Sequence, residues 1–246
     1  MRVALVIITY NISAEIMLLQ VSAIKKLCKD EDFTIIIVDN SSDTDKAQDL
    51  CYHSRLLGIT YHKTFSSSIN SSDSHSFSAN LSYQKLKDHF DIMAYFDHDL
   101  IPMREFSVME TLGDNVIVGL GQGAKKKYFW PGCVMFDNTK IDHNIVDFSP
   151  NNEFGLDTGG NFYRIIEEYG EDKCIFFNET YHQNPHFIST QYGHYAMIND
   201  GMFMHFIASS NWVGLEDNEN RINSLLNIAR EKLNSGQKEN TNIYEG

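Results

Sequence analysis

IMAYFDHDLIP, residues 92–102, is the stretch that decides the fold, because an apolar run ends there in two aspartates, Asp97 and Asp99. A short run of aromatic and aliphatic residues is typical of a strand that is buried on both faces. The polar residues mark the point where this strand leaves the core, so we expect both aspartates at its carboxyl end. In an open α/β sheet, ligands bind in the crevice beyond the carboxyl ends of the strands.

Two carboxylates that lie one residue apart at such a bend can share a hard divalent cation. One of them would ligate the ion, and the other would hold a bound water or a substrate hydroxyl. The alternative is a plain acidic surface turn, because acid-x-acid triplets are common. Taken alone, the triplet favours the surface turn, and only the context along the rest of the chain changes this balance.

The composition excludes some classes of partner. The chain has 246 residues, 42% of them hydrophobic, which suits one large α/β domain. Its 20 Lys and Arg stand against 33 Asp and Glu, a formal net charge of −13. Such a surface repels phosphate backbones and anionic lipids, so nucleic acid is not an expected partner. An anionic ligand would need a local positive centre, which a bound metal can supply.

The cysteines and the N-terminus indicate the compartment. The four cysteines form no CxxC pair. This favours an interpretation of the cysteines as small buried hydrophobic residues in a reducing compartment. The N-terminal apolar run is too short for a signal peptide, and no run has membrane-spanning length. We therefore expect a cytoplasmic protein without a transmembrane segment, and peripheral membrane contact is left open.

Two more strand ends are expected beside the acidic pair. Residues 3–9 and 33–39 are continuous β-branched or aliphatic runs, and a helix that starts near Ser13 separates them. In such a βαβ unit the right-handed crossover places both strand ends on the same edge of the sheet. Residues 9–11 and 39–42 should therefore face one crevice.

The same patterns predict the other elements and one compact body. The Ser-rich stretch 65–78 reads as a loop, either a plain linker or a lid, and the tail from residue 234 is too polar to bury. Strand–helix alternation fades after about residue 120. The expected helices are 45–56, 79–90, 105–112, 161–169 and 216–233, and the expected strands are 58–62, 116–120, 133–136 (after a turn at 130–132) and 174–178.

Five stretches, in this order, resemble GT-A-type glycosyltransferases, close in style to family 2. They are VIITYN at 6–11, IIIVDNSS at 35–42, SANLSYQK at 78–85, YFDHD at 95–99 and PGCVMF at 131–136. Beyond residue 136 only MHF, around His205, and the region of Asp157 find counterparts. No single motif is specific, and their order and spacing carry the resemblance.

This resemblance implies an α/β fold with a Rossmann-like mixed, mostly parallel sheet flanked by helices. Residues 1–120 would form the nucleotide-sugar-binding half and 121–233 the acceptor-binding half of the same domain, followed by a loose polar tail at 234–246. Thr9, Tyr10 and Asn11 would line the base and ribose of the donor.

Further roles follow from the same resemblance. Asp39, with Asn40 beside it, would accept a hydrogen bond from the base, commonly uracil, and Asn80 would lie near the donor's phosphates or ribose. Asp97 would contact the ribose or metal-bound water.

The resemblance also implies a metal site. Asp99 would ligate a Mn²⁺ or Mg²⁺ ion that bridges the diphosphate, with Asp97 beside it, and His205 would complete the metal shell. For His205 the alternative is a packed histidine between Phe203 and Phe206.

Inverting transfer further needs a general base that takes the proton of the acceptor hydroxyl. Family 2 enzymes often place this base in a Glu-Asp pair, and no such pair follows the PGCVMF stretch here. Asp157, in LDTGG, is the candidate, and its alternative is a simple cap on the following helix. This departure leaves the identity of the base and the inverting outcome open.

The need for a metal also follows from the chemistry of sugar transfer, without reference to the family. Cleavage of a sugar from a nucleoside diphosphate leaves two negative charges on the departing group, which a divalent cation stabilises. The leading hypothesis is a metal-dependent glycosyltransferase of the hexosyltransferase, inverting type. It would move a sugar from a nucleotide-diphosphate donor, a UDP-sugar, to a glycan or other hydroxyl acceptor in surface polysaccharide synthesis.

Three alternatives remain. A sugar nucleotidyltransferase would need a Gly-rich N-terminal loop with Arg and Lys, where this chain has Thr-Tyr-Asn. A degenerate module could bind a nucleotide or glycan without turnover. A metallohydrolase is the weakest alternative, because two acids and one distant histidine offer few ligands for a catalytic metal ion. Side chains that could serve an acceptor pocket, or simply pack or face solvent, are Trp130, Tyr181, Trp212, His182, His186 and His194.

Overall fold

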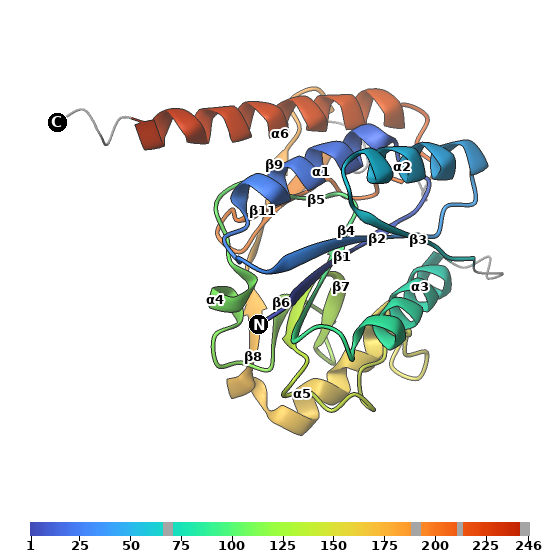
Figure 1. The fold of residues 1–246 in the computed structure, drawn as a ribbon, viewed down its shortest axis with the longest axis vertical. Helices are drawn as coiled ribbons and strands as arrows, with labels where there is room; N and C mark the ends of the chain where they lie inside the picture. Colours follow the sequence, from blue (N-terminus) through green and yellow to red (C-terminus); the bar gives the residue numbers. More distant parts are fainter. Residues whose placement is uncertain (66–70, 188–192, 211–213, 242–246) are drawn as a thin grey trace.

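A seven-stranded sheet forms the centre of the part that this computed structural model describes, residues 1–65, 71–187, 193–210 and 214–241 (Figure 1). The strand order is β3-β2-β1-β4-β7-β6-β8. All of these strands run in one direction except β7, which is antiparallel to both of its neighbours. The expected mixed, mostly parallel sheet is confirmed. Its strands are β1 (Val3–Thr9), β2 (Phe33–Asp39), β3 (Thr60–Lys63), β4 (Ile92–Asp97), β6 (Ile117–Gln122), β7 (Tyr128–Asp137) and β8 (Cys174–Phe177).

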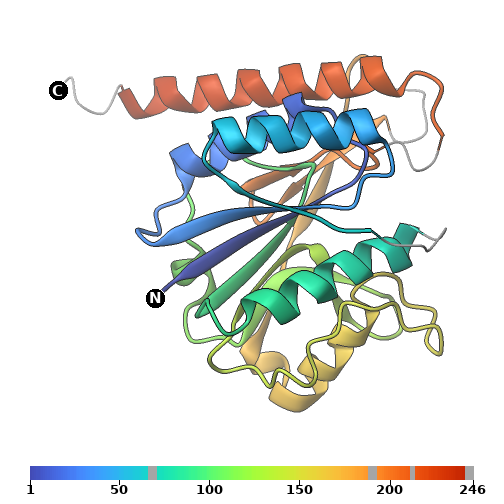
Figure 2. The same ribbon diagram turned by 45° about the vertical axis from the view of Figure 1, so that its right-hand side comes forward.

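Helices cover both faces of this sheet in one compact body. One face carries α1 (Ala14–Leu27), α2 (Thr44–Leu56) and α6 (Asn218–Thr241), and the other carries α3 (Ser71–Leu86) and α5 (Tyr163–Tyr169) (Figures 1 and 2). The short helix α4 (Val108–Leu112) and the 3-10 turns η1 (Gly160–Phe162) and η2 (Glu171–Lys173) lie in connections. Among the described helices, none has both the length and the apolar character needed to cross a bilayer.

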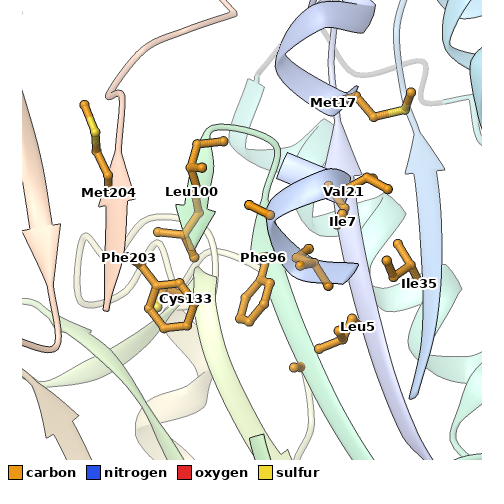
Figure 3. Close-up of a cluster of buried hydrophobic side chains, with 14 of the residues drawn as sticks. Leu5, Ile7, Met17, Val21, Ile35, Phe96, Leu100, Cys133, Phe203 and Met204 are labelled. Carbon is orange, nitrogen blue, oxygen red and sulfur yellow. The ribbon is translucent and has the colours of Figure 1, made fainter. Parts of the chain in front are cut away.

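Strand β1 lies at the middle of the core because its alternate side chains enter two separate clusters. Leu5 and Ile7 pack toward α1, where Met17 and Val21 belong to the same cluster (Figure 3). The intervening Val6 belongs to the cluster on the α3 face. The whole strand is buried, which is why its sequence shows a continuous β-branched run instead of alternation.

A second, antiparallel sheet forms beside the first, and the sequence did not predict it. Its order is β5-β11-β10-β9, and its strands are β5 (Leu100–Pro102), β11 (Phe203–His205), β10 (His194–Ile198) and β9 (Glu179–Gln183). The ring centroid of Phe203 lies 5.3 Å from that of Phe96 and 5.4 Å from that of Phe106. These three rings join the two sheets next to Asp97 and Asp99 (Figure 3 shows Phe96 and Phe203).

The prediction of a loop over 65–78 is wrong for most of its length, because α3 begins at Ser71. Serine hydroxyls in this helix bond back to its own carbonyls, as Ser78 Oγ does to the Ser74 carbonyl at 3.3 Å. Such bonds satisfy the serines without interrupting the helix. Residues 66–70 lie outside the described part of the chain.

The prediction of a turn at residues 130–132 is wrong as well. Trp130, Pro131 and Gly132 lie inside β7 and do not form a turn, and the register of β6 against β7 shifts between Gly119 and Gly121. A shift of this kind accommodates a proline, which cannot donate a ladder hydrogen bond.

Helix α6 continues to Thr241, past the predicted end of the 216–233 helix and into the stretch expected to be a loose tail. Residues 242–246 lie outside the described part.

The aromatic join between the two sheets makes a test of the fold. Phe203 is fully buried between the sheets, so we expect Phe203→Ala to lower the free energy of unfolding by about 3–5 kcal/mol. Tyr181→Ala, on the exposed strand β9 of the same sheet, should cost less than about 1 kcal/mol. Urea denaturation measures both, and equal losses would show that the rings do not hold the sheets together.

Candidate active site

The acidic turn lies at the carboxyl end of β4, as expected. Asp97 ends β4, and Asp99 directly precedes β5, which belongs to the second sheet. His98 lies between them, and its Nδ1 is 2.9 Å from Asp97 Oδ1. One potential ligand atom from each of these three residues lies within 4.8 Å of the other two. The two aspartates therefore face the same small volume, where a cation can bridge them.

Gln20, from α1, holds this turn in shape. Its Nε2 donates hydrogen bonds to the carbonyl of Asp97 at 2.7 Å and to that of Leu100 at 2.8 Å, one on each side of the turn. Gln20 is fully buried, and the sequence analysis missed it. The available signal was a glutamine beside Val21 on the apolar side of a helix, where an amide must find internal partners.

His205 meets Asp99 because β11 pairs with β5. The register places His205 opposite Leu100, and His205 Nε2 lies 3.4 Å from Asp99 Oδ1. Both residues are largely buried, and the backbone N–H of Ser209 lies 3.4 Å from Asp99 Oδ2. The sequence expectation that His205 joins Asp99 is therefore matched in placement, and its metal role stays a prediction.

Electrostatics favours the ionised form of Asp99. Burial alone would raise the pKa of Asp99, but the neighbouring His205 and His98 outweigh it and hold that pKa below its usual range. Burial likewise opposes the charged form of His205, and Asp99 raises the pKa of His205 in spite of it. For His98, burial is outweighed by Asp97 and Asp99, so its pKa rises to about 9. Asp99 is thus an ionised carboxylate in a largely water-excluded setting.

His75, on α3, approaches the turn from the other face of the sheet. Its Nε2 lies 3.9 Å from Asp97 Oδ1, and neither ring nitrogen makes a hydrogen bond within the described structure. Burial lowers the pKa of His75 and outweighs the opposing effect of Asp97, so the ring is neutral. The sequence analysis missed this residue because it assigned residues 65–78 to a loop.

Asp157 is brought to the start of the same helix. Ser72 Oγ donates to Asp157 Oδ1, and Thr158 Oγ1 donates to the carbonyl of Ser72 at 3.3 Å. Asp157 is exposed, and its charge acts on His75. The helix α3 therefore carries His75 between Asp97 and Asp157.

The ends of β1 and β2 lie side by side, as expected, and hydrogen bonds join them. Thr9 Oγ1 donates to Asp39 Oδ1 at 3.0 Å, and the backbone N–H of Asn11 donates to Ser41 Oγ at 2.8 Å. The Tyr10 hydroxyl lies 3.4 Å from Ser42 Oγ.

Asp39 is more enclosed than its expected role requires. Its Oδ1 accepts from Thr9 and from the N–H and hydroxyl of Ser41, and its Oδ2 accepts from the Tyr61 hydroxyl at 2.6 Å. The side chain is fully buried. A direct contact with a nucleotide base, which stays a prediction, would require the buried carboxylate to become accessible.

Asn40 and Asn80 both tie α3 to its surroundings. Asn40 Nδ2 donates to the Ser74 carbonyl at 3.1 Å. Asn80 Nδ2 donates to Asp147 Oδ1 at 3.2 Å, and its Oδ1 accepts from the Phe148 N–H at 3.0 Å. In the structure these amides brace the helix that carries His75, and their contacts with a donor stay predictions.

The residues around Asp99 fit a divalent cation. Asp99 Oδ1 and His205 Nδ1 are buried, and neither has a hydrogen-bond partner in the described ranges. A buried polar atom left unpaired often marks a missing ion or water. Carboxylate oxygens together with an imidazole form a ligand set that suits Mn²⁺ and, with more water, Mg²⁺. Asp97 and Asp99, whose ligand atoms group with one of His98, would hold such an ion, and His205, beside Asp99, would complete its shell.

The aromatic candidates for an acceptor pocket are scattered. The Trp130 and His205 rings lie 4.8 Å apart between centroids, so Trp130 borders the acidic turn. Tyr181, which is 61% exposed, and His182 lie on β9 and face His194 and Tyr195 of β10, respectively. His186 follows β9. Trp212 lies outside the described residues.

No family model matches this chain, and no curated protein matches it either. The chain is similar in fold to glycosyltransferases. One is a mannosyltransferase, PcManGT from Pyrobaculum calidifontis, in complex with GDP-Man and Mn²⁺, at 12% identity over 71% of this chain and 54% of that chain, TM-score 0.49. Another is glucosyl-3-phosphoglycerate synthase from Mycobacterium tuberculosis with Mn²⁺, UDP and glucosyl-3-phosphoglycerate, at 13% identity over 71% and 68%, TM-score 0.47.

A third is the galactosyltransferase LgtC with donor and acceptor sugar analogs, at 12% identity over 70% of this chain and 72% of that chain, TM-score 0.43. The present chain spans about half the length of the mannosyltransferase. Membership of family 2 in particular stays a prediction. At such TM-scores these likenesses carry no argument about donor, acceptor or reaction, for which the chain's own residues must serve.

The two hydrogen bonds that Gln20 donates to the acidic turn can be tested by mutation. We expect Gln20→Met to lower the free energy of unfolding by about 2 kcal/mol, because two carbonyls of the turn lose their donors. The matched control is Gln48→Met on the exposed side of α2, which should be nearly neutral. Chemical denaturation compares the two, and equal stability would show that the turn holds its shape without Gln20.

Proposed function

We propose that this protein is a metal-dependent glycosyltransferase that moves a sugar from a nucleotide-diphosphate donor to a hydroxyl acceptor. The observation that supports the proposal most is the buried approach of His205 to Asp99, at 3.4 Å, at the carboxyl end of β4. Hydrogen bonds also join the polar ends of β1 and β2, at the same edge of the sheet. A cation-binding pair next to a polar crevice suits a ligand that carries a diphosphate.

The chain's net charge strengthens this reasoning. At −13, the protein repels a diphosphate unless a positive centre lies where the phosphates bind. A bound Mn²⁺ or Mg²⁺ supplies positive charge that stabilises the departing diphosphate. Asp99 and His205 would hold that ion, Asp97 would orient its water or the donor ribose, and the crevice at Tyr10 and Asn11 would take the nucleoside.

Asp157 is the general base of this proposal. Its carboxylate is exposed, as access to an acceptor hydroxyl requires, and the N–H of Thr158 and the hydroxyl of Ser72 orient its Oδ1. In an inverting transfer, the carboxylate would take the proton of the acceptor as the new glycosidic bond forms. The finer parts of the proposal are a UDP-sugar donor of the hexosyl type, a glycan acceptor in surface polysaccharide synthesis, and a cytoplasmic location.

Donor turnover tests the metal pair. With Mn²⁺ and a panel of nucleotide sugars, we expect Asp99→Asn and His205→Ala to lower donor hydrolysis or transfer about 100-fold or more. Asp114→Asn, an exposed acid in the turn before β6, is the matched control and should behave as wild type. Equal turnover by Asp99→Asn and wild type would remove the acidic turn from the reaction.

A second experiment separates catalysis from binding. We expect Asp157→Asn to lower transfer about 100-fold while UDP binding with Mn²⁺, measured by calorimetry, stays unchanged, because the base acts on the acceptor and not on the donor. Unchanged transfer would exclude Asp157 as the base. UDP binding by wild type without turnover of any donor or acceptor would instead show a degenerate binding module.

A further inference from the structure

Arg221, in the first turns of α6, is a buried cation that donates hydrogen bonds to the loop at residues 206–209. It is 2% exposed, although arginine is among the residues most rarely buried. Its Nη1 donates to the carbonyls of Phe206 at 3.2 Å and Ile207 at 2.9 Å, and its Nη2 donates to that of Ala208 at 2.9 Å. One guanidinium thus holds three consecutive carbonyls of the loop that follows His205.

Asn218, one turn earlier on α6, fixes the orientation of this guanidinium. Asn218 Oδ1 accepts from Arg221 Nε at 3.1 Å and from Nη2 at 2.7 Å. Asn218 Nδ2 also donates to the carbonyl of Ser209 at 3.3 Å. The start of α6 therefore holds every carbonyl from residue 206 to residue 209.

The 206–209 loop contains two residues with unfavourable backbone dihedral angles. Ile207 and Ala208 both have φ of 55°, in the left-handed region. This region is uncommon for any residue with a Cβ and a genuine outlier for a β-branched one such as Ile207. Such a conformation persists only where surrounding contacts enforce it, and strained segments of this kind cluster at functional sites. The donors of Arg221 and Asn218 are the contacts that enforce it here.

The same loop touches Asp99 at two points. The backbone N–H of Phe206 donates to the carbonyl of Asp99 at 3.1 Å, and the N–H of Ser209 lies 3.4 Å from its Oδ2. His205, which faces Asp99, directly precedes the loop. Any relaxation of Ile207 and Ala208 would therefore move His205 and Asp99 relative to each other.

Arg221 cannot take a direct role in binding phosphate. Its Nε, Nη1 and Nη2 are all directed at the loop carbonyls and Asn218, and the side chain has almost no exposed surface. Its influence on the site must therefore pass through the 206–209 loop, together with the long-range attraction between its charge and that of Asp99.

We propose that Arg221 is a positioning residue which, through the 206–209 loop, holds Asp99 and His205 in the geometry that binds a divalent cation. The inference rests on the proposed metal site and extends it to α6. Residues that orient metal ligands from behind typically change metal affinity by about 10- to 100-fold when they are replaced. The helix α6 then belongs to the active site and does more than cover the core.

The test measures Mn²⁺ affinity of the metal-free full chain by the electron paramagnetic resonance signal of the free ion, without any nucleotide. We expect Arg221→Met to weaken binding about 10-fold or more. Arg221→Lys keeps the charge but cannot reach three carbonyls with a planar fork, so it should give an intermediate loss. The lysine variant also keeps the test valid if the methionine variant does not fold.

The matched control is Leu225→Ala, one turn further along α6 and fully buried. It should lower the midpoint of urea unfolding yet leave Mn²⁺ affinity within about twofold, because its apolar side chain has no donor for the carbonyls of the loop. If the Arg221 variants lose stability as Leu225→Ala does and bind Mn²⁺ as wild type does, Arg221 is a structural anchor only and the inference is wrong.

Asp99→Asn separates this inference from the proposed function. Loss of Mn²⁺ binding in Asp99→Asn, with none in the Arg221 variants, would overturn the positioning role alone. Equal binding by Asp99→Asn and wild type would overturn the metal site itself, and the positioning role with it.

Discussion

Burial of the Asp99 carboxylate against the imidazole of His205 is the interaction on which the candidate site at the end of β4 depends. A buried carboxylate without a partner costs several kcal/mol, so the chain must place a polar partner beside it. It does so by pairing β11 with β5, which places His205 opposite Leu100. The register of β11 against β5 therefore gives the buried carboxylate of Asp99 its partner, and it also brings together two residues of the candidate site.

A buried ion pair is weak support for stability, because hydrophobic residues of similar volume often serve as well. Here buried polar atoms without a hydrogen-bond partner in the described residues also lie at the pair and near it, namely His205 Nδ1 and the ring nitrogens of His75. A core selected for stability alone would not keep these groups. Their presence at the carboxyl end of a central strand argues that function, and not packing, maintains them.

The sequence predicted the part of the structure that hydrophobic runs control. Continuous β-branched runs identified β1 and β2, and the polar residues after them correctly placed the two strand ends side by side. The acidic turn was found for the same reason, because the apolar run before Asp97 ends abruptly.

The rest depends on tertiary contacts that leave little trace in sequence. Gln20 and Arg221 are polar residues at buried helix positions, and only the structure shows which carbonyls they reach. The strands β5 and β11 are too short to show a period of two. No propensity would place Ile207 in the left-handed region, where the contacts around it hold it.

The antiparallel strand β7 makes the two halves of the chain inseparable. It comes from the second half, yet it inserts between β4 and β6 of the first half, while β5 of the first half joins the sheet of the second. Division of the chain near residue 120 would leave open hydrogen-bonding edges on both fragments, and such edges invite aggregation. A cut at this point would therefore separate strands that must pair with each other.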